Sequence, residues 1–368
     1  MKKWIVVFII LLSTTALHAQ ERIYHFTSDF LFRYERQQFP DIFPGRDDVD
    51  RFRVRWRPGV VIKPNLIWTI GLEVEANGIH ESDGDVDPPR FPEFHSPIFD
   101  RDNFKRNSVV LSKAFAKYSP TSDLEFIGGK FDNPFITTEM VWDNDLRPNG
   151  GVLKVSAGAD DEAWRITGRI GDFYASHYLH DRTNVVAAQG AFILTEGVTK
   201  LTFAASYYDH NVHDLDPSLV RTNTRSGFGL LNDYNLFDLI GRVRFGFEFV
   251  PIMAQFDYVH NTAANSFDPS MPGNGDTGWL VEATVGQFEE VGDFELGWAY
   301  HHVESDAVLA AYNTDDWWFP TRGEGYRIHG GLMVAPHVII SASYLNQSFI
   351  DQSPEFKRWQ VNCIVKWP

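Results

Sequence analysis

The sequence predicts an all-β protein, a transmembrane antiparallel β-barrel of about sixteen strands with long outer loops and short periplasmic turns. Three observations support this fold class. The chain begins with a segment typical of exported proteins, apolar and polar residues alternate with a period of two along most of the chain, and the connections between the alternating segments are short and long in turn. Together they favour a barrel over a secreted sandwich of two sheets.

The N-terminal segment has the features of an export signal. Two lysines follow the initiating Met, residues 4–12 form a continuous apolar run, and small and polar residues lead to Ala19. The apolar run is about half the ~20 residues that a spanning helix needs, so we expect a cleaved signal peptide over residues 1–19 rather than an anchor. Residues 20–368 then form a single outer-membrane barrel, because no linker or change in composition marks a second domain.

The alternating segments carry apolar residues on one face and charged residues on the other. They are about 9 to 14 residues long, which fits a tilted transmembrane strand and exceeds a usual sandwich strand. The apolar face is therefore expected to contact lipid, and the charged face to line the interior. The residues expected to face lipid are Phe52, Val54, Trp56, Trp164, Phe245, Trp298 and Trp359.

Counting these segments gives about sixteen strands, plus or minus about two, and a bacterial barrel requires an even number. The long connections fall on one end of the barrel and the short ones on the other, as expected for outer loops and periplasmic turns. The expected strands are 23–36, 50–58, 64–77, 107–118, 123–131, 150–158, 163–175, 184–197, 198–209, 235–249, 251–262, 277–288, 293–304, 323–335, 337–349 and 355–367.

Composition excludes several other classes of protein. The formal net charge is −16, and a surface that acidic repels nucleic acid. The single cysteine excludes an internal disulfide framework and a cysteine-rich zinc site. The mean hydropathy of −0.25 excludes a polytopic helical membrane protein.

One stretch resembles a known family, the putative porins of Gram-negative outer membranes. The resemblance covers about 25 residues that begin at Phe126, and the barrel layout agrees along the mature chain. It implies a general-porin-like barrel, in which an outer loop folds inward and narrows the channel. The matching positions are Gly129-Lys130, Asn133-Pro134-Phe135, Trp142-Asp143, Asp145-Leu146 and Gly150.

The segment 132–149 is the candidate constriction loop. It combines acidic residues with an apolar cluster that includes Phe135 and Trp142. A loop in solvent has little use for such a cluster, whereas a loop packed against an inner wall buries it. A loop that only caps the barrel from outside is the alternative. The charged residues expected at the constriction are Asp132, Glu139, Asp143, Asp145 and Arg147.

Arginines dominate the charged face of the second strand. They recur at alternate positions, ~6.6 Å apart, and an arginine near the midplane on the lipid side would cost ~2–4 kcal/mol, so they are expected on the inner wall. A positive wall that faces an acidic loop across a constriction would orient and select solutes by charge. A role only in wetting and cross-linking the wall is equally open. The expected channel-lining residues are Arg51, Arg53, Arg55, Arg57, Arg165, Arg169, Arg242 and Arg244.

Other candidate sites are weaker. The alternating carboxylates of segment 83–87 could bind a divalent cation, but a plain acidic loop is the favoured interpretation. His210 and His213 are expected to be loop decoration, and the rings of His301 and His302 should point to opposite faces of a strand. We therefore expect no metal site, no cofactor and no catalytic residue.

Three functions remain as hypotheses. The first is a diffusion channel for small hydrophilic solutes or ions, the second an outer-membrane barrel enzyme of the lipase or protease type, and the third a structural or adhesin barrel with a blocked lumen. The expected partners are outer-membrane lipids and lipopolysaccharide, the barrel-assembly machinery that reads the C-terminal strand, and the solutes themselves. A homotrimer is a further expectation, and no nucleic acid is expected.

Overall fold

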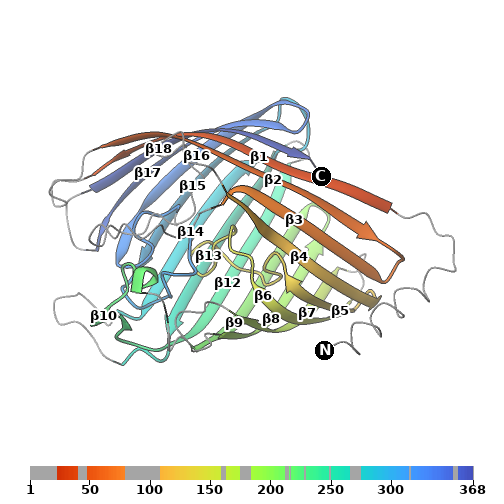
Figure 1. The fold of residues 1–368 in the computed structure, drawn as a ribbon, viewed down its shortest axis with the longest axis horizontal. Coiled ribbons are helices and arrows are strands. Elements are labelled where there is room, and N and C mark those ends of the chain that lie inside the picture. The colour runs from red at the N-terminus through yellow and green to blue at the C-terminus, as the bar shows by residue number, and fades with distance from the viewer. Residues whose placement is uncertain are drawn as a thin grey trace.

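The computed structural model describes residues 23–39, 48–78, 108–158, 163–174, 184–211, 215, 217–227, 229–247, 250–265, 275–314, 316–350 and 355–367. These residues form a closed antiparallel barrel, in which the first strand pairs with the last (Figure 1). Closure satisfies the backbone groups that an open sheet would leave unpaired at its edges, so the wall can stand in lipid.

Sixteen strands form the barrel, as the sequence predicts. They are β1 (Ile23–Gln38), β2 (Val49–Lys63), β3 (Trp68–Gly78), β4 (Ser108–Thr121), β5 (Leu124–Lys130), β6 (Asn149–Ala157), β7 (Trp164–Tyr174), β8 (Asn184–Glu196), β9 (Thr199–Asn211), β12 (Tyr234–Phe247), β13 (Val250–Asn261), β14 (Thr277–Gly286), β15 (Phe294–Val303), β16 (Gly323–Ala335), β17 (Val338–Phe349) and β18 (Glu355–Trp367).

The strands follow one another around the barrel in chain order. The long connection between β9 and β12 contains a short helix, η2 (Pro217–Val220), and a two-stranded hairpin of β10 (Arg225–Ser226) and β11 (Gly229–Leu230). The sequence predicts a single loop between the strands that end at 209 and begin at 235, because strands of two residues produce no periodic pattern.

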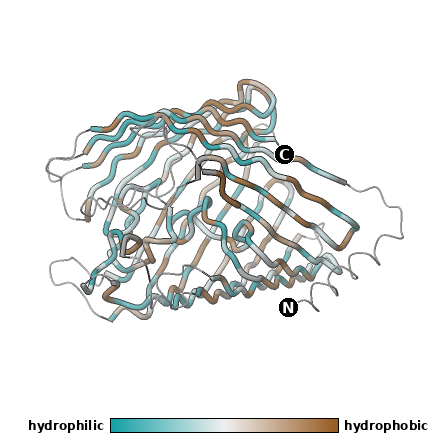
Figure 2. The backbone as a smooth tube through the Cα atoms, viewed as in Figure 1, coloured by the Kyte–Doolittle hydropathy of each residue, from teal (hydrophilic) through white to brown (hydrophobic). Residues whose placement is uncertain are grey.

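Burial alternates along the strands, and the register has the expected orientation. Phe52 and Trp56 are about half exposed on the outer face, whereas Arg53 and Arg57, which each follow one of them, are buried. Figure 2 shows the corresponding alternation of hydrophobic and hydrophilic residues along the strands. The same outward exposure holds at Trp164, Phe245, Trp298 and Trp359.

The interior contains a hydrophobic core, which the sequence does not predict. The sequence pattern predicts a closed wall that is stable without a protein core. In the structure, inward-facing residues of the wall pack against the loops 131–148, 217–227 and 304–314. Met140, Trp142 and Leu309 are almost fully buried in this cluster, together with Tyr208 and Leu236 from the wall. The outer half of the barrel is therefore partly filled, since the loops supply the apolar surface that a polar lumen lacks.

Several expectations lie outside the described residues. They are the signal peptide 1–19, the acidic segment 83–87, His213 and the C-terminal Pro368. Within the described ranges, no helix has the length and apolar character needed to cross a membrane.

Candidate channel constriction

The loop 131–148 (yellow in Figure 1) lies inside the barrel and begins by attaching to β8 and β13. The backbone N–H of Ile136 donates to Oε1 of Gln189 on β8 at 2.9 Å, and the backbone oxygen of Ile136 accepts from Nε2 of the same glutamine at 2.7 Å. Two residues later, the Thr138 hydroxyl donates to Asp257 on β13. Three polar contacts thus fix this part of the loop.

The loop then reaches the opposite side of the barrel. Glu139 forms a 2.9 Å ion pair with Arg327 on β16, and Asp145 forms ion pairs with Arg55 and Arg57 on β2 at 2.7 and 2.8 Å. In the closed order of strands, β2 lies nearly opposite β13. The loop therefore crosses the lumen rather than capping the barrel from outside.

A second loop, residues 304–322, joins the first. The backbone N–H of Asp143 donates to the backbone oxygen of Tyr312 at 2.7 Å, and the rings of Trp142 and Tyr312 stack with centroids 5.6 Å apart. Nε1 of Trp317 donates to Glu139 at 2.6 Å. The sequence predicts one inward loop, 132–149, whereas in the structure two loops contact each other inside the barrel.

One side of the interior is an ion-paired wall, formed by arginines of β1, β2 and β18 with carboxylates of the wall and of both loops. Glu35 is fully buried and pairs with Arg51 at 2.6 Å and Arg53 at 3.4 Å. Asp316 of the second loop pairs with Arg33 on β1 and Arg358 on β18 at 3.6 and 3.7 Å. The members of this wall are Arg33, Arg51, Arg53, Arg55, Arg57 and Arg358.

The sequence-based interpretation of the arginine row as one side of an open gap is wrong at Arg55 and Arg57. Asp145 touches both guanidinium groups instead of facing them across a pore, because like charges at alternate positions attract a counter-ion into contact. Burial alone would raise the pKa of Asp145, but Arg55 and Arg57 outweigh burial and hold that pKa well below its usual range. The pKa of Asp316 is lowered as well, since Arg33 and Arg358 outweigh the effect of its burial.

The other side of the interior carries an amide wall, named for the glutamines that hold its arginines. Oε1 of Gln189 accepts from Arg169 at 3.0 Å, Oε1 of Gln255 accepts from Arg242 at 2.9 Å, and Arg244 donates to Gln287. With Lys200, these three arginines border a cavity of about 650 Å³ beneath Ile136 of the first loop. The amide wall consists of Arg169, Lys200, Arg242 and Arg244.

The remaining charged residues expected at the constriction have other contacts. Asp132 pairs with Lys113 at 2.8 Å and with Arg147 at 2.9 Å, at the base of the loop. Asp143 is buried and its Oδ1 accepts from the backbone N–H of Asp145 at 2.7 Å, so it shapes the turn that presents Asp145. Arg165 lies on the inner face of β7, beside the amide wall.

The expectation that His210 decorates a loop is wrong, because His210 lies at the end of β9, is buried, and stacks on Tyr312 with ring centroids 5.6 Å apart. His301 and His302 behave as the strand geometry predicts. His301 is buried inside, stacked on Trp317 with ring centroids 3.7 Å apart, whereas His302 approaches Glu324 at 3.1 Å from the neighbouring strand. Among the described residues, no group of three or more His, Cys, Asp or Glu side chains is arranged to hold a metal ion.

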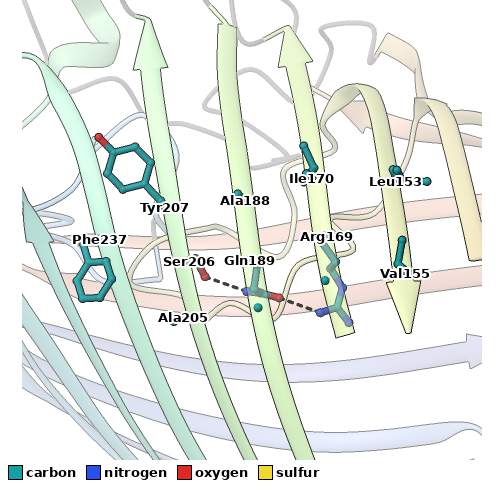
Figure 3. Close-up of a pocket in the computed structure, with 12 residues that line it drawn as sticks. Leu153, Val155, Arg169, Ile170, Ala188, Gln189, Ala205, Ser206, Tyr207 and Phe237 are labelled. Carbon is teal, nitrogen blue, oxygen red and sulfur yellow. Dashed lines mark hydrogen bonds between the residues drawn. The ribbon is translucent and has the colours of Figure 1, made fainter. Parts of the chain in front are cut away.

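A second hollow, of about 470 Å³, lies on the outer surface of β6 to β9 and β12 (Figure 3). Exposed apolar residues such as Ile170, Tyr207 and Phe237 border it, and Gly168 and Gly190 leave its floor open. The figure also shows Gln189 hydrogen-bonded to Arg169 and Ser206, an interaction that belongs to the inner face. The outer hollow is therefore separate from the constriction.

A closed sixteen-stranded barrel with an apolar outer face and loops folded across a charged interior defines the outer-membrane channel class. The model of the putative porin family matches residues 34–214 and 209–357, so the chain belongs to that family. It is an outer-membrane protein of the porin type. Comparison with functionally curated proteins gives no match.

Solved structures of similar fold are outer-membrane proteins of low sequence identity. OprB of Pseudomonas putida is 11% identical, with a TM-score of 0.60 and coverage of 97% of this chain and 96% of that one. OmpF of Salmonella typhi, solved with daunomycin, is 9% identical, with a TM-score of 0.55 and coverage of 94% and 97%. The channel DcaP of Acinetobacter baumannii is 11% identical, with a TM-score of 0.52 and coverage of 94% and 97%. At these identities the likeness establishes the fold alone.

Proposed function

We propose that the protein forms a water-filled channel for the passive diffusion of small hydrophilic solutes or ions, and that its constriction is formed by the loops 131–148 and 304–322. The observation that carries the proposal is the first loop, which crosses the lumen from Asp257 on β13 to Arg55 and Arg57 on β2. A loop anchored by hydrogen bonds on one side and by ion pairs on the other narrows a passage to a fixed width.

The passage would run beside the loop through two neighbouring cavities. The cavity under the loop, of about 650 Å³, and a smaller one of about 320 Å³ beside the loop are both bordered by Ile136 and Arg242. The smaller cavity is bordered by Asp132 and Asp143, and the larger one by the amide wall. A solute would pass from an acidic to a basic environment, with Arg242 at the junction.

A barrel with a blocked lumen is the second candidate, because the internal hydrophobic core fills part of the outer half. A barrel enzyme is the third, and it predicts hydrolysis of an ester or peptide without conductance. Under each of these three functions, the exposed outer aromatics would contact outer-membrane lipid and lipopolysaccharide. Insertion by the barrel-assembly machinery and a homotrimeric state are further parts of the proposal.

The test is conductance of the purified, refolded protein in planar lipid bilayers. A channel gives stepwise current increases in KCl and allows liposomes loaded with erythritol or arabinose to swell. A structural barrel gives neither, and an enzyme hydrolyses p-nitrophenyl esters or a casein substrate. Absence of single-channel steps from protein that migrates as a folded, heat-modifiable barrel would overturn the proposal.

A further inference from the structure

The amide wall differs from the rest of the charged interior in the partners of its cations. Among the described residues, no carboxylate lies within ion-pair distance of Arg169, Lys200, Arg242 or Arg244. Glutamine oxygens fix the direction of the three guanidinium groups without cancelling their charge. Such arginines are oriented in advance for an anion.

The strand register places like charges opposite each other in the amide wall, and no carboxylate within the wall relieves their repulsion. Lys200 on β9 lies directly opposite Arg244 on β12, and Arg242 follows on the same face of β12. Like charges directly opposite each other on neighbouring strands destabilise a sheet. The ion-paired wall relieves the same repulsion by inserting carboxylates, and the amide wall does not.

The nearest carboxylates have partners of their own. Glu295, which borders the cavity, lies 3.7 Å from His329, and Glu282 accepts from Gln255, the residue that also holds Arg242. On the far side, Glu125 forms a 3.2 Å ion pair with Lys117. The cavity therefore has four cations on its lining against one carboxylate.

Arg169 is the buried arginine of the amide wall and lies next to the loop 131–148. Arg169 is 8% exposed, and its Nε has no hydrogen-bond acceptor among the described residues. Its guanidinium donates to Gln189 (Figure 3), and the same glutamine holds the backbone of Ile136 in the loop 131–148. An anion at Arg169 would thus sit immediately below the loop.

We infer that the cavity of the amide wall is a binding subsite for small oxyanions, namely solutes that carry carboxylate or phosphate groups. Arginine presents a planar fork of N–H donors that matches both groups, and charge-assisted hydrogen bonds are about twice as strong as neutral ones. Two or three such groups around about 650 Å³ suit a solute of a few carbon atoms with more than one negative charge. The inference rests on the proposed channel function and gives it a preferred class of solute.

The experiment compares the wild-type protein with the double variant Arg242→Gln/Arg244→Gln. Reversal potentials in a KCl gradient should show preference for chloride in the wild type, and the ratio of chloride to potassium permeability should fall roughly fivefold in the variant, because two positive charges beside the passage are lost. Succinate and inorganic phosphate are the probes of binding. Each should block the KCl current of the wild type and release heat on titration into the detergent-solubilised protein, and both effects should be lost in the variant.

Two further variants separate specific binding from net charge. Arg242→Lys/Arg244→Lys keeps both charges, so the permeability ratio should persist while the block by succinate and phosphate weakens, since lysine lacks the planar fork. Arg36→Gln/Lys357→Gln removes two cations from the exposed outer rim and should leave every readout unchanged.

Each outcome has one meaning. Block by only one of the two probes still supports the subsite and identifies its chemistry as carboxylate or phosphate. Equal block and equal heat in the wild type and the glutamine variant, or no block and no heat in either, would overturn the subsite while leaving the channel intact. Absence of conductance with retained heat of binding would instead overturn the channel and retain the subsite.

Discussion

The two basic walls of the barrel are both rich in arginine, but the groups that contact their cations differ. On β1, β2 and β18, arginines at alternate positions each meet a carboxylate, so that Asp145 and Asp316 bring the two loops to the wall. On β7, β9 and β12, the cations meet glutamine oxygens or face the cavity. The comparison teaches that positive charge in this interior has two uses. One wall fixes the architecture of the constriction, and the other keeps its charge available to a solute.

The largest difference should appear when one charged side chain is neutralised in each wall. Glu35→Gln leaves Arg51 and Arg53 without their buried carboxylate, and removal of one partner of a buried ion pair costs about 3–5 kcal/mol. The measurement is the midpoint of urea-induced unfolding in detergent, followed by heat-modifiable migration on gels. Arg244→Gln on the amide wall is the matched control, and it should change the free energy of unfolding by about 0.5 kcal/mol or less. Equal destabilisation by the two variants would remove the distinction between the walls.

The second largest effect is expected from a substitution that converts part of the ion-paired wall into an amide wall. Asp145→Asn preserves the shape of the side chain but exposes the charge of Arg55 and Arg57, so anion preference should rise roughly two- to fourfold. Reversal potentials in a KCl gradient give the ratio. Asp48→Asn removes one carboxylate from the exposed outer end of the barrel and serves as the control. A shift toward cations in the Asp145 variant would contradict the assignment.

A smaller effect is expected from the reverse conversion. Gln287→Glu places a carboxylate beside Arg244, which should lower anion preference by less than about twofold because this arginine is exposed and salt screens it. The reversal potential should move further from the wild-type value in 0.05 M than in 1 M KCl. Gln287→Asn, which shortens the side chain without adding charge, should leave the reversal potential where it is. A change of equal size in both variants would mean that geometry rather than charge is responsible.

The smallest effect concerns pH. Because the pKa values of Asp145 and Asp316 are lowered in the folded protein, their ion pairs contribute stability that is fully present above the ordinary carboxyl pKa of about 3.9 and is lost as the pH falls through the lowered values. Single-channel conductance should therefore stay constant between about pH 8 and pH 5. A change should begin only below about pH 4, when the loops lose their anchors. A transition near pH 6 would show that another group controls the loops.

The fold could be predicted from the sequence because each of its signals is local. Lipid on one side and polar groups on the other impose a period of two on every strand, so residues such as Trp56 and Arg57 report their faces directly. The strand count and the alternation of turns and loops follow from that pattern. The inward position of loop 131–148 also has a local signal, since an apolar cluster inside an acidic loop needs a wall to cover it.

The partners of the arginines could not be predicted in the same way. Arg55 and Asp145 are 90 residues apart, and nothing near either residue specifies the other. The second loop, however, carries a readable signal. Asp316, Trp317 and Phe319 repeat the combination of acid and large apolar residues that marks the first loop, and the same criterion applied to 304–322 predicts an inward position. The amide wall depends on glutamines from three other segments, so its character emerges only from the register.

Asp316 lies across the line where the barrel closes. Arg33 belongs to the first strand and Arg358 to the last, and one carboxylate holds both. Beside it, Nε of Arg33 donates to Asn362 at 2.7 Å and Nε2 of Gln360 donates to Glu35 at 2.9 Å across the same line. A cylinder whose ends have not yet met cannot offer Asp316 partners on both sides, so this ion-paired anchor of the second loop is completed only at closure. The full set of contacts that holds the two loops can therefore form only in a barrel whose first and last strands have already paired.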